Sequence, residues 1–228
     1  MQRILASAIA ALCLIAPAAH AATQPAVVFS GVISAASDGM SRGISETTGN
    51  PQGIVNLTLT HGPLYGGFLL KNVATPEGAD SQHVFYVGLR GKVDGFQLNA
   101  QAYLRNNDGA RPGTDHVFSE YQVDASRTFD NTTAKLLWMY SPDFYAATKS
   151  SSWVEASLSQ KLTTQWSISG AYGHRSVTPK KDYNGWNFGA TYSLRPKTLI
   201  DFRYYDTDEH HLGKPYVGRY LAMLTQKF

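Results

Sequence analysis

The 228-residue sequence contains a single cysteine, Cys13, and lacks several other features that define common classes of protein. Because this cysteine lies near the N-terminus, the rest of the chain has no thiol for a disulfide bond or a thiolate metal site. The formal net charge of +3 is too small to indicate a nucleic-acid partner. Beyond residue 21, no run approaches the roughly 18 apolar residues that a membrane-spanning helix requires. No glycine-rich phosphate loop and no long helical period of hydrophobicity are present.

Residues 1–21 have the pattern of a secretory signal peptide. Arg3 provides a basic start, an apolar core runs from Ile4 to Ile15, and Ala19-His20-Ala21 forms a cleavage site of the A-x-A type. The sequence therefore predicts an exported protein whose mature chain comprises residues 22–228.

Short segments of alternating polarity dominate the rest of the chain. From Phe96 to Arg105 the even positions are apolar and the odd positions are mostly polar, and residues 186–195 repeat this pattern. Such alternation is typical of a β-strand with one apolar face and one polar face. The pattern predicts twelve strands, near residues 27–38, 53–60, 64–73, 83–93, 95–105, 117–127, 131–140, 151–161, 164–173, 183–194, 198–206 and 216–228.

The links between these segments are alternately short and long. Short links such as 61–63 and Asp94 alternate with longer ones such as 74–82 and 106–116. Outer-membrane barrels connect their strands in this way, and their two aromatic belts fit the 13 Tyr, 10 Phe and 4 Trp of this sequence. The sequence therefore predicts an all-β fold, a transmembrane antiparallel up-and-down β-barrel of about twelve strands.

The last segment, Tyr216 to Phe228, ends the chain on an aromatic residue. Tyr220 and Leu224 share one face of the predicted strand. Because an unpaired strand edge is costly in lipid, we expect this strand to pair with the first one and close the barrel. The segment also resembles the C-terminal assembly signal of bacterial outer-membrane barrels, which implies that Phe228, Leu224 and Tyr220 direct assembly. Gln226 departs from that signal, where an apolar or aromatic residue is usual.

Several short blocks recur in one order along a known family of barrels. They are Phe29-Ser30-Gly31, Ser37-Asp38, Arg42-Gly43-Ile44-Ser45, Tyr140-Ser141-Pro142-Asp143-Phe144-Tyr145, Tyr183-Asn184-Gly185-Trp186-Asn187-Phe188-Gly189 and Tyr204-Tyr205-Asp206-Thr207. With these blocks the chain resembles the TorF-like porin family of proteobacteria over nearly all of its predicted mature length. The resemblance implies an outer-membrane β-barrel with a pore function, and it supplies no catalytic residues.

Charged side chains gather at alternate positions of the predicted strands, on the face that would line the lumen. A charge on the lipid face costs roughly 2–4 kcal/mol near the bilayer midplane, so this placement favours the barrel. Two interpretations remain open: a cationic wall that favours anionic solutes, or internal ion pairs that fill a narrow barrel. Arg90 is either unpaired or locked to an acid such as Glu120. The candidates for the lumen wall and its selectivity are Arg42, Lys71, Arg90, Lys92, Arg105, Glu120, Arg203 and Arg219.

Taken together, the sequence predicts a porin of the bacterial outer membrane for passive diffusion of small solutes, without cofactor, metal or catalytic residues. Its partners would be outer-membrane lipid and lipopolysaccharide, the barrel-assembly machinery and small solutes, with no nucleic acid. One alternative is a structural barrel without an open pore. Another is a barrel enzyme acting on lipid or lipopolysaccharide, because His174 and Ser176 share a strand face, although no third residue evidently orients the histidine. The acidic and histidine side chains of 206–211 form either a solvated loop or a site for a divalent cation.

Overall fold

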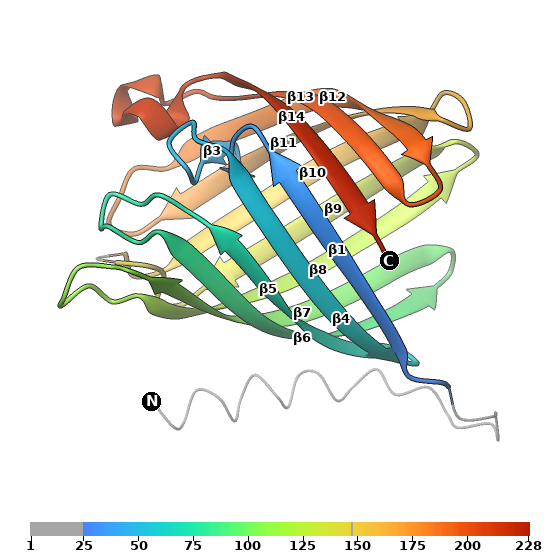
Figure 1. The fold of residues 1–228 in the computed structure, drawn as a ribbon, viewed down its shortest axis with the longest axis horizontal. Coiled ribbons are helices and arrows are strands. Elements are labelled where there is room, and N and C mark those ends of the chain that lie inside the picture. The colour runs from blue at the N-terminus through green and yellow to red at the C-terminus, as the bar shows by residue number, and fades with distance from the viewer. Residues whose placement is uncertain (1–24, 147) are drawn as a thin grey trace.

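The computed structural model describes residues 25–146 and 148–228, so the predicted signal peptide lies outside the described residues. In this part of the chain twelve antiparallel strands form a closed barrel in which each strand pairs with its neighbours in sequence (Figure 1). The barrel strands are β1 (Val28–Ala36), β4 (Gln52–His61), β5 (Leu64–Asn72), β6 (Ser81–Val93), β7 (Phe96–Asp108), β8 (Val117–Phe129), β9 (Thr132–Ser141), β10 (Ser151–Lys161), β11 (Trp166–Val177), β12 (Tyr183–Arg195), β13 (Thr198–Thr207) and β14 (Arg219–Lys227).

The predicted fold class is confirmed, and each barrel strand overlaps one predicted segment. Among the larger differences in strand ends is that of β11, which continues to Val177 whereas the prediction ended it at residue 173. Residues 174–177 stay in register with β10, where Trp153 opposes Arg175 and Ser151 opposes Val177. Because β11 continues to Val177, Arg175 belongs to a barrel strand and its side chain lies on the lumen face of the wall.

The long and short connections lie at opposite ends of the barrel, with the long loops on the left in Figure 1. In outer-membrane barrels the long loops face outward, so we call that end the outer end. The first long loop contains a small hairpin of β2 (Met40–Ser41) and β3 (Ile44–Ser45). The last one contains two single 3-10 turns, η1 (His210–Leu212) and η2 (Lys214–Tyr216). Neither turn, and no other helix within residues 25–146 and 148–228, has the length and apolar character needed to span a bilayer.

The first and last strands close the barrel, as the free-edge argument predicted. The β1–β14 ladder runs from Val32 opposite Lys227 to Ala36 opposite Met223. Beyond it, the backbones of Gly31 and Phe228 exchange hydrogen bonds of 3.1 and 3.0 Å. The Phe228 ring covers Gly31 so closely that a Cβ there would lie 2.2 Å from a ring carbon.

The outer surface of the wall is apolar and the inner surface is polar. Outward-facing side chains such as Phe85, Leu104 and Phe188 are more than half exposed. An apolar surface of this extent marks contact with a membrane or a partner, and on a closed barrel it forms the lipid-facing belt. Aromatic pairs lie toward each end of this belt. Trp166 and Tyr192 lie at the short-turn end with ring centroids 4.8 Å apart, and Trp138 and Tyr140 lie at the outer end, 6.0 Å apart.

Candidate functional site

A cavity of about 1140 Å³ occupies the half of the barrel that lies toward the short turns. Uncharged polar side chains of β4–β7 make up much of its wall, because the lumen-facing parity of these strands carries amides, hydroxyls and phenols. They include Asn56, Thr58, Tyr65, Tyr86, Asn99 and Gln101. The charged side chains in this wall are Arg90, Lys92, Arg105 and Asp124.

The charges of this larger cavity are not balanced. Asp124 forms an ion pair with Lys135 at 3.1 Å. Arg90 and Lys92 form no ion pair with any described carboxylate, and the Arg90 guanidinium lies 5.4 Å from the centre of the Tyr65 ring. The cavity wall therefore carries uncompensated positive charge toward its short-turn end.

The first long loop folds into the outer end of the barrel through its β2–β3 hairpin. Arg42 and Gly43 form the hairpin turn with φ values of 52° and 83°, the left-handed conformation that both central residues of a type I′ turn require. Gly43 packs directly against β12, because a Cβ at this position would lie 3.0 Å from the Cα of Gly185. The turn thus presents the Arg42 side chain to the lumen while its backbone lies against the wall.

Arg42 reaches a carboxylate that it shares with a second arginine. Its Nη2 donates to Glu120 Oε1 at 2.5 Å, and Arg105 Nε lies 2.6 Å from Glu120 Oε2. Glu120 is only 2 % exposed. The hydroxyl of Tyr183 on β12 donates to the Arg42 carbonyl at 3.1 Å, so this cluster links the hairpin to β7, β8 and β12.

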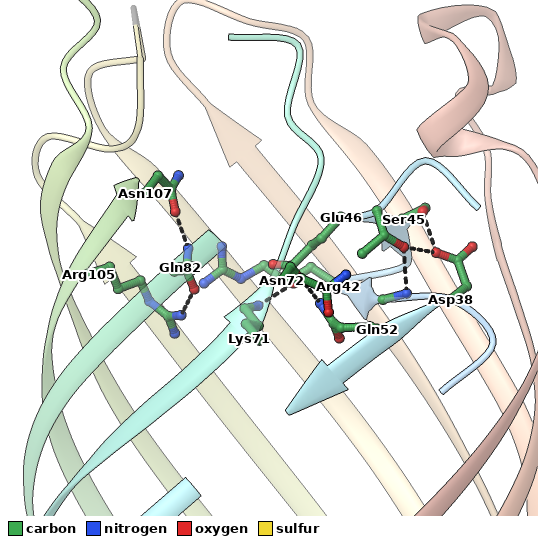
Figure 2. Close-up of polar contacts among 12 residues, drawn as sticks. Asp38, Arg42, Ser45, Glu46, Gln52, Lys71, Asn72, Gln82, Arg105 and Asn107 are labelled. Carbon is green, nitrogen blue, oxygen red and sulfur yellow. Dashed lines mark hydrogen bonds and ion pairs between the residues drawn. The ribbon is translucent and has the colours of Figure 1, made fainter. Parts of the chain in front are cut away.

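Further polar contacts hold the hairpin in place (Figure 2). The Ser45 hydroxyl donates to Asp38 at 2.6 Å, and Arg219 Nε lies 3.4 Å from the same carboxylate. Glu46 is paired with the ammonium of Lys71. Burial alone would raise the pKa of Glu46, but the charge of Lys71 and its hydrogen bond, together with the charges of Arg105 and Arg42, outweigh burial and keep that pKa below its ordinary range.

A second cavity of about 230 Å³ lies on the outer side of this cluster, beneath the long loops. Arg42, Arg175, Phe144 and Tyr216 are among its lining residues. Arg105 lines the larger cavity and Arg42 the smaller one, and both contact Glu120. The three side chains therefore form a partition between an inner and an outer chamber of the lumen.

The structure brings together three of the eight predicted lumen residues at this partition, namely Arg42, Arg105 and Glu120, and Lys71 is paired with Glu46 of the first long loop. Arg90 and Lys92 lie in the larger cavity, and Glu120 contacts Arg42 and Arg105 rather than Arg90. Arg203 lies on β13 and is paired with Asp201 at 3.1 Å, and Arg219 lies beside Asp38 at the outer end. The roles of these eight residues in selectivity stay predictions.

Sequence reasoning missed two residues that shape the site, Arg175 and Phe144. The ring centre of Phe144 lies 4.5 Å from the Arg175 guanidinium and 5.6 Å from that of Arg42. Alternation extended through residue 175 would have placed Arg175 in the lumen. Phe144 lies in the loop after β9, and the one sequence signal for it was the family block of residues 140–145 that contains it. That block meets the blocks containing Arg42 and Tyr183 at this point, so sequence segments far apart along the chain converge on the hairpin.

The residues considered for an enzyme do not form a catalytic arrangement among the described contacts. His174 Nδ1 lies 2.9 Å from the Asn184 side-chain oxygen, and no hydrogen bond joins it to Ser176 in the described part of the chain. In the last loop His210 pairs with Asp206 at 2.6 Å. The described His, Asp and Glu side chains include no group of three placed to hold a metal ion.

The fold is similar to that of solved outer-membrane channels. The match to the KdgM porin has a TM-score of 0.60 at 8% identity and covers 87% of this chain and 99% of that one. For the NanC porin the values are 0.60, 8%, 87% and 98%. For an outer membrane channel from Pseudomonas putida F1 they are 0.58, 11%, 94% and 100%. No protein-family model and no curated protein sequence matches the chain. At these identities the similarity shows the fold, a closed antiparallel barrel like those of these outer-membrane channels.

Proposed function

We propose that this protein is a porin of the bacterial outer membrane through which small solutes diffuse passively, with a preference for anions. One observation carries the proposal: a closed barrel with an apolar outer surface encloses a polar cavity of about 1140 Å³ that contains unpaired cations. Small barrels fill their interiors with side chains. A chamber of this size is left unfilled here, so packing of the interior does not account for it. Arg90 and Lys92 would attract anions into it, because fixed charges in a narrow lumen act within a Debye length of roughly 8 Å.

The hairpin of residues 40–45 would set the size limit of the path. Solutes would pass between the chambers at the partition formed by Arg42, Arg105 and Glu120. Two guanidinium groups facing one carboxylate leave this partition with an excess positive charge. Both chambers would therefore favour the same class of solute.

A structural barrel without conduction is the second candidate, and the packing at the outer end favours it. Met139, Trp153 and Tyr183 form a buried apolar cluster inside the barrel, with Ile44 of the hairpin packed against them. If the hairpin never moves, this cluster and the partition together would close the lumen.

The proposal includes the cellular setting expected from the sequence. Residues 1–21 would direct export, and the barrel-assembly machinery would recognise Phe228, Leu224 and Tyr220. Lipid and lipopolysaccharide would surround the apolar belt. We also propose membership of the TorF-like porin family, which is supported by the meeting of its blocks at Arg42, Phe144 and Tyr183.

Solute uptake into liposomes tests the function. Vesicles containing the folded barrel should swell faster than empty vesicles in small anions, and more slowly in cations of equal size. Folding is checked separately, because a closed barrel migrates differently on a denaturing gel before and after boiling. A heat-modifiable protein that gives no swelling with any solute would contradict the porin and leave the structural barrel.

A further inference from the structure

Arg175 is a buried cation that contacts the Phe144 ring but has no described carboxylate partner. Its residue is 5 % exposed, and its guanidinium neither donates a hydrogen bond nor forms an ion pair within the described part of the chain. Its Nε is fully buried and unsatisfied. An unpaired buried charge is costly, and burial of a charge is normally accompanied by pairing. The Phe144 ring, 4.5 Å from the guanidinium, gives it a cation–π contact but no counter-charge.

The guanidinium of Arg175 faces the outer chamber, which it lines together with Arg42 and Lys180. The acidic residues in this wall are Glu46 and Glu77, and Glu46 is already paired with Lys71. Arg42 is likewise occupied by Glu120. Arg175 is therefore the buried cation of this chamber that remains available to an incoming anion.

The rest of the chamber wall is largely apolar and aromatic. Phe118 and Phe144 lie edge to face with ring centroids 4.8 Å apart, and Tyr183 and Tyr216 lie edge to face at 5.3 Å. The volume of about 230 Å³ is below the roughly 300–1,000 Å³ of pockets for drug-sized ligands. The chamber therefore suits a small molecule with an apolar part.

We propose that the outer chamber is a binding site for a small organic carboxylate, whose carboxylate group pairs with Arg175 and whose apolar part lies against Phe144 and Tyr216. The planar fork of a guanidinium matches the two oxygens of a carboxylate. This inference rests on the proposed porin function, in which the site lies on the solute path and concentrates such anions at the outer end.

Calorimetric titration of the detergent-folded protein with benzoate tests the site without requiring conduction. Benzoate should bind at one site per chain, and the neutral analogue benzamide should not compete. Arg175→Gln should raise the dissociation constant about tenfold or more, as expected for loss of a charge-assisted hydrogen-bonded pair. Arg175→Lys should also weaken binding, because it keeps the charge and loses the fork. The matched control is Arg90→Gln, which removes a cation from the other chamber and should leave the affinity unchanged.

Each of these measurements has a result that would contradict the proposed carboxylate site. Absence of benzoate binding to the wild-type protein would contradict it, and that comparison needs no variant that might misfold. Equal effects of Arg175→Gln and Arg90→Gln would show attraction by net charge alone. Sulfate binding as tightly as benzoate, with the same dependence on Arg175, would contradict the carboxylate class. Binding that depends on Arg175 in a protein that never conducts would support the site and contradict the porin.

Discussion

Replacement of Glu120 by Gln tests whether the hairpin limits the pore. The substitution keeps the shape of the side chain and removes the charge that holds Arg42 at 2.5 Å and Arg105 at 2.6 Å. Removing one partner of a buried ion pair costs about 3–5 kcal/mol, because the other charge is left uncompensated. Here we expect about 3 kcal/mol, the lower limit, because the two guanidinium groups face chambers large enough to hold water.

This free energy would act mainly on the docking of the hairpin, since the barrel ladder does not depend on Glu120. Each 1.4 kcal/mol changes an equilibrium constant tenfold, so the ratio of docked to released hairpin should fall roughly 100-fold. The remaining anchors, including the Glu46–Lys71 pair and the Ser45–Asp38 hydrogen bond, should keep it docked for part of the time. Single-channel recording of Glu120→Gln in a planar bilayer should therefore show a higher mean conductance and frequent transitions between levels.

Asp124→Asn is the matched control for this experiment. Asp124 also lines the inner chamber and pairs with Lys135 at 3.1 Å, but it makes no described contact with the hairpin. Both substitutions remove one negative charge from the lumen, so both should increase the preference for anions. An increase in conductance as large in Asp124→Asn as in Glu120→Gln, or no increase in either, would refute the assignment of the hairpin as the constriction.

Three further predictions concern the hairpin, the seam and selectivity. Gly43→Ala should raise single-channel conductance, because it strains a residue at φ 83° and places a Cβ against the backbone of β12. The control Gly113→Ala should leave the conductance unchanged, because Gly113 has a similar φ of 86° but no atom lies within 4 Å of the added Cβ. Deletion of Phe228 should sharply reduce the heat-modifiable barrel recovered from outer membranes, whereas Phe129→Ala, at another lipid-facing aromatic, should not; a normal level of the truncated protein would show that the seam does not govern assembly. Arg90→Glu should move the reversal potential toward cations with little change in stability, about 0.5 kcal/mol or less. A destabilised barrel with unchanged selectivity would instead make Arg90 structural.

Much of the architecture could be predicted from the sequence because it follows from a period of two. Alternation assigns a face to each residue, and the alternating short and long links give the order and pairing of strands. Because a free strand edge is costly in lipid, the pairing of the last strand with the first, where Phe228 meets Gly31, was also predictable. Gln226, the departure from the terminal pattern, lies beside the turn before β13 and accepts a hydrogen bond from Thr198 at 2.7 Å.

The arrangement within the lumen could not be predicted, because parity fixes the side of the wall but not which side chains meet. Arg42 and Glu120 are far apart in sequence and come together because the first loop folds inward. The turn at Arg42-Gly43 lies in a loop without alternating polarity, so no sequence period indicated its position. Arg175 was missed for a different reason: the predicted strand ended at residue 173, two residues before Arg175, so the alternation that places it in the lumen was not applied.

The reversal potential of single channels in a salt gradient tests the central claim most directly. The folded protein is inserted into a planar bilayer, and the potential at zero current is measured with a tenfold gradient of potassium chloride. We expect discrete conductance steps and a reversal potential of the sign produced by chloride permeation, and this potential should shrink as the total salt concentration rises. A conducting barrel with cation selectivity would contradict the anion-preferring lumen, and a folded barrel with no conductance would contradict the porin itself.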